Sequence, residues 1–337
     1  MWHLRSVIEL VNYMNNDYFF LQSGELVNVG NGELRSLIRS YQPEARIKNL
    51  GSRLVLVNAE LDIERIMARA AFTKSAGRLL QMSNKVTGFE LNGMMKSYRT
   101  FACDLVNLSR KRVDTNVLSE LGNYVKRRTP WMNVSLENPD VIILLIKTEM
   151  EWIVGLVQHK MTNNWKHEST RNRPYFHPVA LEPKICRLMI NLAMLREDDT
   201  MLDPFCGTGS IMLEAESMGI NTVGCDLSNK MCKGALTNLR SANNGMIVNC
   251  DALSLPLKMD CVDSIVTDLP YGRSASTLKR RPGELLKEFL DVIGETKAKR
   301  CCVMCRKGDE QSFPNIVEQY DIFEHKSLTR KLMVVCN

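Results

Sequence analysis

Four acidic residues, each closing a short apolar run, are the most chemically suggestive feature in the second half of this 337-residue chain. Each run has the length and composition of a buried strand. The carboxyl ends of parallel strands meet at one edge of a sheet, where ligands bind, so the four carboxylates are expected at one site. A single acid there is more often a helix cap or a solvated loop residue, but four in succession are hard to explain in that way. The four residues are Asp203, Asp226, Asp251 and Asp268.

The first acid opens a glycine-rich turn, Asp203-Pro-Phe-Cys-Gly-Thr-Gly209, that leads into an apolar helix. Strand, glycine turn and helix are typical of a nucleotide-cofactor loop, because glycine lets the backbone approach a ligand and a helix N-terminus offers N–H groups. The turn lacks the Gly-Lys-Ser/Thr ending of a phosphate loop. The Asp203 carboxylate would repel phosphate and suits a cationic amine. S-adenosylmethionine, with its ammonium, carboxylate and adenosine, fits better; an ordinary glycine turn is the alternative for this motif alone.

The next two acids fit the adenosine part of such a cofactor. Asp226 follows the glycine turn by roughly 20 residues, the spacing of an acid that binds both ribose hydroxyls. Asp251 precedes Ala252, and its carboxylate is placed to accept from the adenine amino group. The residues predicted to bind the cofactor are Asp203, Pro204, Cys206, Gly207, Gly209, Asp226, Leu227, Asp251, Ala252 and Asp268.

The fourth acid begins the turn Asp268-Leu-Pro-Tyr271, which resembles the Asp/Asn-Pro-Pro-Tyr/Phe signature of the class I amino-methyltransferases. The resemblance implies that Asp268 accepts one N–H of an exocyclic amine and that the backbone carbonyl of Leu269 or Pro270 accepts the other. It also implies that Tyr271 can stack on the base and that the proton leaves to Asp268 or to water. Leu269 stands where the signature usually has proline, which affects the rigidity of the turn more than the chemistry.

Taken with the N-terminal half, the motif Thr267–Ser274 resembles the archaeal tRNA guanine-10 N2-methyltransferases, which carry a THUMP domain. This resemblance covers nearly the whole chain from about Tyr18. It implies transfer of methyl from S-adenosylmethionine to N2 of a guanine in tRNA, at position 10, and leaves open whether one or two methyl groups are added. It also leaves open whether a small activator subunit binds the chain, which otherwise acts as a monomer.

Two other hypotheses remain. The substrate could be a guanine elsewhere in tRNA or in ribosomal RNA, or the N6 amine of an adenine. Alternatively the chain could be a non-catalytic tRNA-binding subunit, although such a protein has no need of four intact acids.

The elements that must position these residues form an α/β chain of several domains. The N-terminal part shows the order β-α-β-β-α-β of a ferredoxin-like unit, and the closing segment predicts a helix over 313–319 followed by two strands. The predicted organisation is an extension of unassigned role (1–17), a ferredoxin-like domain (18–85), a THUMP domain (86–160), a polar linker (161–174) and a Rossmann-like, seven-stranded methyltransferase domain (175–337).

Clustered basic residues mark the expected tRNA contacts. Residues 1–160 hold 21 Lys and Arg against 16 Asp and Glu, so the N-terminal half is the more basic one. Adjacent cations attract phosphate without reading sequence, although such triplets are also common as solvated helix or strand ends. The predicted RNA-binding residues are Arg110, Lys111, Arg112, Lys126, Arg127, Arg128, Lys279, Arg280 and Arg281.

Composition sets the broad class. An apolar share of 45% and a charged share of 24% are those of a soluble globular protein. The longest apolar run, Val141–Ile146, is too short to span a membrane, and no signal-peptide pattern begins the chain, so a cytoplasmic location is expected. Eleven cysteines fit a reducing compartment. Cys302 and Cys305 have the spacing of metal ligands but no second pair, which favours core packing over metal binding.

Overall fold

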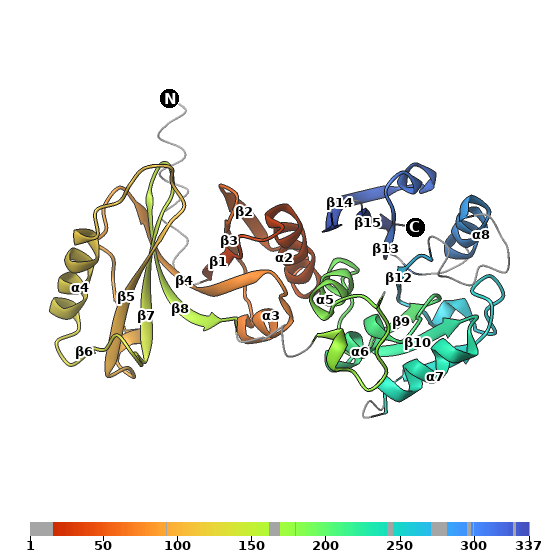
Figure 1. The fold of residues 1–337 in the computed structure, drawn as a ribbon. Helices are drawn as coiled ribbons and strands as arrows, with labels where there is room; N and C mark the ends of the chain where they lie inside the picture. The colour runs from red at the N-terminus through yellow and green to blue at the C-terminus, as the bar shows by residue number, and fades with distance from the viewer. Residues whose placement is uncertain are drawn as a thin grey trace. The chain divides into compact units, whose positions relative to one another are not determined.

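The computed structural model describes residues 16–91, 93–161, 169–178, 180–240, 245–270, 282–294, 298, 300–325 and 328–336. The chain divides into two units. The first holds most of the N-terminal half up to Thr162. The second holds the chain from Asn163 onward together with Gly32–Tyr41 and Arg69–Ala71. Figure 1 traces the elements of each unit.

The first unit is built on a mixed sheet. Its strands are β1 (Asp17–Gln22), β2 (Arg46–Leu50), β3 (Leu54–Asn58), β4 (Thr73–Ser83), β5 (Thr100–Asn107), β6 (Asn133–Val134), β7 (Val141–Lys147) and β8 (Trp152–Lys160). Along the chain, helix α2 (Val27–Tyr41) follows β1, α3 (Ile63–Arg69) follows β3, and α4 (Asn116–Arg128) follows β5; most of α2 and the last residue of α3 are assigned to the second unit. The elements from β1 to β4 therefore appear in the predicted order β-α-β-β-α-β.

The two halves of this unit share one sheet. Over the described residues the sheet has eight strands in the order β2-β3-β1-β4-β8-β7-β5-β6. Strand β4 pairs antiparallel with β1 on one side and with β8 on the other, from Ser75 opposite Lys160 to Ser83 opposite Trp152. The predicted boundary between residues 85 and 86 falls just after β4, inside this continuous sheet.

The second unit holds the predicted seven-stranded sheet. Its strands are β9 (Thr200–Asp203), β10 (Asn221–Asp226), β11 (Gly245–Asn249), β12 (Ser264–Asp268), β13 (Arg300–Arg306), β14 (Ile316–His325) and β15 (Leu328–Cys336). In the part of the chain that the structure describes, they lie in the order β11-β10-β9-β12-β13-β15-β14. The first five are parallel, and β15 runs antiparallel to both β13 and β14.

Helices of the second unit pack on this sheet. They are α5 (Pro183–Leu192), α6 (Ser210–Ser217), α7 (Asn229–Asn238) and α8 (Pro282–Gly294). Figure 1 shows α6 and α7 beside β9 and β10. Leu202 of β9, Ile265 of β12 and Phe289 of α8 are fully buried in one core cluster. Because both faces of a parallel sheet are covered, its central strands β9 and β12 are buried along nearly their whole length.

The helix predicted over 313–319 is wrong. Residues 309–312 form a short 3-10 turn, and β14 begins at Ile316. This segment carries β-branched and aromatic residues, and the strand pairs along its length with β15, for example Tyr320 with Leu332. Pairing at the sheet edge therefore overrides the helical spacing of its apolar residues.

Candidate active site

The four predicted acids lie along one edge of the second sheet. Strands β11, β10, β9 and β12 are successive neighbours and run in the same direction, so their carboxyl ends meet. Three of the strands end on an acid of the set, and the fourth acid follows β11 by two residues. The structure thus brings Asp203, Asp226, Asp251 and Asp268 to one edge, the usual ligand side of such a sheet.

The glycine turn joins β9 to α6. Gly207 and Gly209 both have positive φ, 52° and 77°, a conformation that favours glycine. A Cβ on Gly209 would lie 3.3 Å from the Ala235 Cβ of α7, so this glycine also allows the turn to pack on that helix. A Cβ on Gly207 would meet nothing within 4 Å, which leaves its backbone open toward a ligand.

Asp226 ties the first two strand ends together. Its Oδ2 accepts from the Gly207 N–H at 3.0 Å, and its Oδ1 accepts from the Ser228 N–H at 2.7 Å. Burial raises the pKa of this carboxyl, while the two backbone donors lower it. Each carboxylate oxygen has a second lone pair, so both remain able to accept from a ligand hydroxyl.

A neighbouring amide that the sequence reasoning missed supports the same loop. Asn249, at the end of β11, donates to the backbone carbonyls of Asp226 and Leu227 at 2.8 and 3.0 Å. Its side chain therefore fixes the backbone that follows β10. On the next loop, the Asp251 Oδ1 accepts from the Leu253 N–H at 3.1 Å, and Ala252 is buried.

Asp203 is almost completely buried, with 1% of its surface exposed. Its Oδ1 accepts from the Thr267 hydroxyl at 2.7 Å and from the Phe205 N–H at 3.3 Å. Burial raises the pKa of its carboxyl to about 7, and these hydrogen bonds offset only part of the effect. Both of these donors are neutral, so a ligand that brings a positive charge would stabilise the ionised form.

The Asp268 turn is held from two sides. The Leu269 N–H donates to the Met304 carbonyl of β13 at 2.9 Å, and the Leu269 side chain is buried. The Arg330 Nη2 of β15 donates to the Asp268 Oδ1 in a salt bridge. Pro270 is half-buried, and Tyr271 lies outside the described residues. No sequence signal connected Arg330 to the turn, because the two residues are 62 positions apart.

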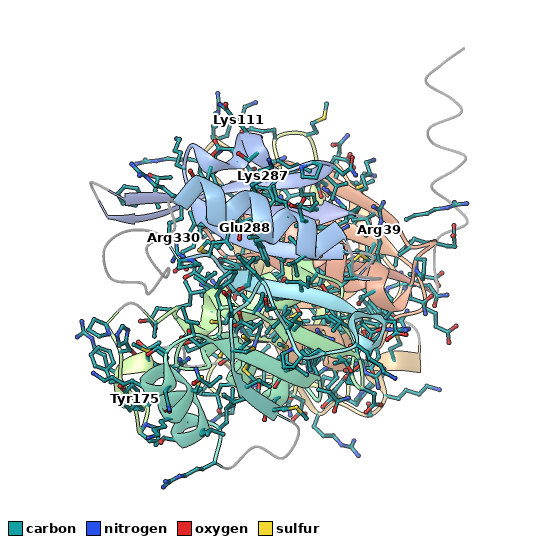
Figure 2. All side chains as sticks on the ribbon, turned by 90° about the vertical axis from the view of Figure 1, so that its right-hand side faces the viewer. Arg39, Lys111, Tyr175, Lys287, Glu288 and Arg330 are labelled. Carbon is teal, nitrogen blue, oxygen red and sulfur yellow. The ribbon has the colours of Figure 1, made fainter. Side chains whose placement is uncertain are left out.

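A segment before α5 packs on the glycine turn. The Asn238 side chain of α7 accepts from the Tyr175 N–H at 2.9 Å and donates to the Tyr175 and Thr208 carbonyls. A Cβ on Gly234 would lie 2.6 Å from the Tyr175 ring, so glycine is required for this packing. Figure 2 shows Tyr175 beside α7. The Arg173 guanidinium of the same segment donates to the Ser210 hydroxyl at the start of α6.

Three free cysteines, Cys206, Cys225 and Cys250, lie in or next to these loops. Cys206 is buried in the glycine turn, and burial raises the pKa of its thiol. The sulfur atoms of Cys225 and Cys250, the residues that directly precede Asp226 and Asp251, lie 2.7 Å apart. Burial also raises the pKa of the Cys225 thiol. Cys206 and Cys225 are buried, as is usual for free cysteine, and Cys250 is partly buried.

The predicted tRNA-binding residues separate into groups. All six cations of 110–112 and 126–128 are exposed. The first triplet follows the carboxyl end of β5, whereas the second ends α4 and precedes β6, which pairs with the start of β5. The triplets therefore lie at opposite ends of α4, a helix of 13 residues and hence about 20 Å long. Lys279, Arg280 and Arg281 lie outside the described residues.

Some of these cations have structural partners. The Lys126 ammonium donates to the Met132 and Pro130 carbonyls, which fixes the turn before β6. The Arg128 guanidinium lies 5.6 Å from the centroid of the Tyr124 ring. At Arg110 only the backbone is fixed by this kind of bond, because its main-chain N–H donates to the Glu149 carboxylate at 2.8 Å.

Two further features of the described part of the chain concern metal-ligand clusters and helices that could span a membrane. The described residues contain no group of three or more His, Cys, Asp or Glu side chains that could hold a metal ion. The helices described here include none that is long and apolar enough to cross a membrane.

Comparison with known proteins identifies relatives. A family profile described as "RMKL-like, methyltransferase domain" matches residues 170–330, and one described as "DNA methylase" matches residues 78–237. The tRNA (guanine(10)-N2)-dimethyltransferase of Methanothermobacter thermautotrophicus is 32% identical over 233 residues, which cover 66% of this chain and 69% of the relative. The enzyme of the same name from Methanocaldococcus jannaschii is 25% identical over 352 residues, covering 94% and 98% of the two chains.

A solved structure gives the same fold. TrmN from Thermus thermophilus superposes with a TM-score of 0.54 at 16% identity, covering 94% of this chain and 98% of that one. At this identity the likeness concerns the fold alone.

Proposed function

This chain belongs to the family of the tRNA (guanine(10)-N2)-dimethyltransferases, and we propose that it transfers methyl groups from S-adenosylmethionine to the exocyclic N2 of guanine 10 in tRNA. It is a methyltransferase whose substrate amine belongs to a nucleic-acid base. The residues at the carboxyl ends of the strands in the second unit's sheet have the charges that this cofactor and this amine require.

We assign three of the acids to different parts of S-adenosylmethionine. Asp203 takes the ammonium group, because a buried carboxylate with a raised pKa gains most from a cationic partner. Asp226 takes the ribose hydroxyls with its remaining lone pairs, and Asp251 accepts from the adenine amino group. Arg173, beside the N-terminus of α6, is assigned to the carboxylate, which both a guanidinium and a helix N-terminus attract.

The chemical step requires positioning more than acid–base strength. The lone pair of an exocyclic amine is delocalised into the ring, so the nitrogen must be held in line with the sulfonium methyl group. Asp268 accepts one N–H of the amine, and the backbone carbonyl of Leu269 or Pro270 accepts the other. Tyr271 is proposed to stack on the guanine, which must leave its stack in the tRNA to reach this turn.

The observation that carries this proposal is the hydrogen bond between Thr267 and Asp203. Its length is 2.7 Å, and both groups are buried. Asp203, proposed to bind the methyl donor, is thereby hydrogen-bonded to Thr267. Thr267 directly precedes Asp268, which is proposed to bind the acceptor amine. Both substrates would then be aligned by one pair of neighbouring parallel strands, β9 and β12.

We propose that the first unit is a THUMP-containing module that binds tRNA through the exposed triplets 110–112 and 126–128. Because these triplets lie at opposite ends of α4, they would contact phosphates that are far apart. Such contacts give affinity and orientation without reading bases.

The test uses the purified protein, unmodified tRNA transcripts and labelled S-adenosylmethionine. Nuclease digestion and mass spectrometry should find N2-methylguanosine at position 10, followed in time by the dimethylated base if the pocket admits a second methyl group. A transcript with adenine at position 10 is the control and should stay unmethylated. Labelled methyl at another guanine would mean that position 10 is not the target. If the protein binds S-adenosylmethionine but transfers methyl to no RNA, the proposal is refuted.

A further inference from the structure

Arg330 contacts the Asp268 carboxylate, which is proposed to accept an N–H of the substrate amine. Arg330 lies outside the motif Asp268-Leu-Pro-Tyr271. Its side chain is only 3% exposed, against 22% for Asp268, and its Nη2 donates to the Asp268 Oδ1. We propose that Arg330 is a positioning residue for methyl transfer. It fixes Asp268 so that one carboxylate oxygen faces the guanidinium and the other is left for an N–H of the target amine. This inference rests on the proposed function.

The sheet topology brings the two residues together. Strand β15 runs antiparallel to β13, so its first residues lie at the edge where β12 ends. Asp268 is in register with Met304 of β13, and Met304 is in register with Leu332, two positions beyond Arg330 on β15. The guanidinium therefore reaches Asp268 across the end of one intervening strand. Figure 2 labels Arg330 in the second unit.

The charge of Arg330 persists despite its burial. Desolvation lowers the pKa of this guanidinium to about 10, which still leaves it protonated at neutral pH. A cation in contact with a carboxylate favours the ionised form of that carboxylate. In a partly buried site this attraction is weakly screened by salt. Asp268 is thus kept as an anion that accepts hydrogen bonds, the form needed while positive charge develops on the amine.

This arrangement assigns the proton to water. In the transfer, the nitrogen lone pair forms a bond to the methyl carbon, and the bond from that carbon to sulfur breaks. Sulfur keeps the electron pair and becomes a neutral thioether, while the nitrogen becomes positively charged. Asp268, already paired with Arg330 through Oδ1, stabilises this charge through its other oxygen, and the proton then passes to a water molecule. The reaction therefore does not require Asp268 to become a carboxylic acid.

The test compares single-turnover methyl transfer to tRNA in full-length variants. Arg330→Met removes the guanidinium and should slow the chemical step by about 10²-fold, the loss expected when a reacting group is displaced by about 1 Å. The affinities for tRNA and S-adenosylmethionine should change by less than about threefold. Arg330→Lys keeps the charge without the planar fork and should recover part of the rate.

A matched control separates positioning from stability. Arg300→Met removes a partly buried arginine of the same sheet, paired with Glu318 at 2.7 Å, from the opposite end of β13. It should destabilise the protein yet leave the single-turnover rate near that of the wild type. Methylguanidinium in solution should restore activity to Arg330→Met and leave the control unchanged, an effect that a merely structural role would not produce.

Coupling to Asp268 is measured by a double-mutant cycle. The double variant Asp268→Asn/Arg330→Met should be no slower than Asp268→Asn alone, because Arg330 acts through Asp268. Multiplicative losses, or a wild-type rate for Arg330→Met, would overturn the inference. Wild-type protein that methylates no tRNA would instead overturn the proposed function. The Arg330–Asp268 pair would then be tested by the same cycle in thermal unfolding, where additive effects would refute it.

Discussion

Asp203→Asn should make the protein more stable and less able to bind its cofactor. Asparagine keeps an oxygen at Oδ1 for the Thr267 hydroxyl and the Phe205 N–H, so the two hydrogen bonds survive. It removes a negative charge that is 1% exposed. The substitution therefore isolates the cost of ionising a buried carboxyl, a cost that only a cationic ligand would offset.

The magnitude follows from the pKa of Asp203, which burial raises from 3.8 to about 7. This difference is about 3 units, each worth 1.36 kcal/mol, so ionisation costs the folded protein about 4 kcal/mol. Between pH 4 and 7 the folded state binds more protons at this site than the unfolded state, so the wild type loses stability as the pH rises through that window. The asparagine variant has no such loss, and its advantage should grow from near zero at pH 4 to its full value above pH 7.

The assay is urea unfolding of the full chain without ligand at several pH values, following the transition that S-adenosylmethionine shifts. Asp263→Asn is the matched control. Its exposed carboxylate accepts from the Thr200 N–H at the other end of β9, so this variant removes a surface charge beside the same strand without removing a buried one. In calorimetry, the affinity of the wild type for the cofactor should rise with pH toward 7, and Asp203→Asn should bind far more weakly. A pH-independent stability difference, or unchanged cofactor binding, would refute the reasoning.

Three other outcomes are expected. Asp226→Ala should raise the cofactor dissociation constant at least tenfold, since a hydrogen bond to a charged group is worth roughly 1.5–3 kcal/mol; an unchanged calorimetric titration would remove Asp226 from the site. Replacing the three cations of 110–112, or those of 126–128, with neutral residues should reduce the slope of log K for tRNA binding against log salt concentration. The reduction is up to about one unit for each phosphate contact that is lost. The two effects should add, because the triplets are far apart. Asn238→Ala should lower the thermal stability and reduce its increase on adding cofactor, because the Thr208 carbonyl loses a buried donor; an unaltered increase would separate Asn238 from the cofactor loop.

The acids and the glycine turn could be located from the sequence because each depends on a local pattern. A short apolar strand followed by Asp predicts a carboxylate at the sheet edge, and parallel pairing then brings the strand ends together. The turn at Gly207 and Gly209 was likewise indicated by residue type, and both glycines have positive φ in the structure. These signals involve only a few adjacent residues, so no long-range information was needed to read them.

The supporting residues depend on contacts that no local pattern records. Arg330 reaches Asp268 only because β15 turns back antiparallel to β13. In the sequence, Asn238 is only a polar residue at the end of α7. Its hydrogen bonds to Tyr175 and Thr208 depend on the fold and cannot be read from local residue types. The start of strand β14 was predicted as a helix because its apolar residues have helical spacing, and only the long-range pairing with β15 makes it a strand.

The sheet shared by the two halves of the first unit has a consequence for biosynthesis. Strand β4 ends at Ser83, but its second neighbour, β8, begins at Trp152. While the ribosome adds the intervening residues, one edge of this 11-residue strand has no partner from its own chain. An open strand edge is a template for pairing with another molecule, and pairing over such a sequence separation is slow. Nascent chains that stall before β8 should therefore be the species most prone to aggregate and most dependent on chaperones.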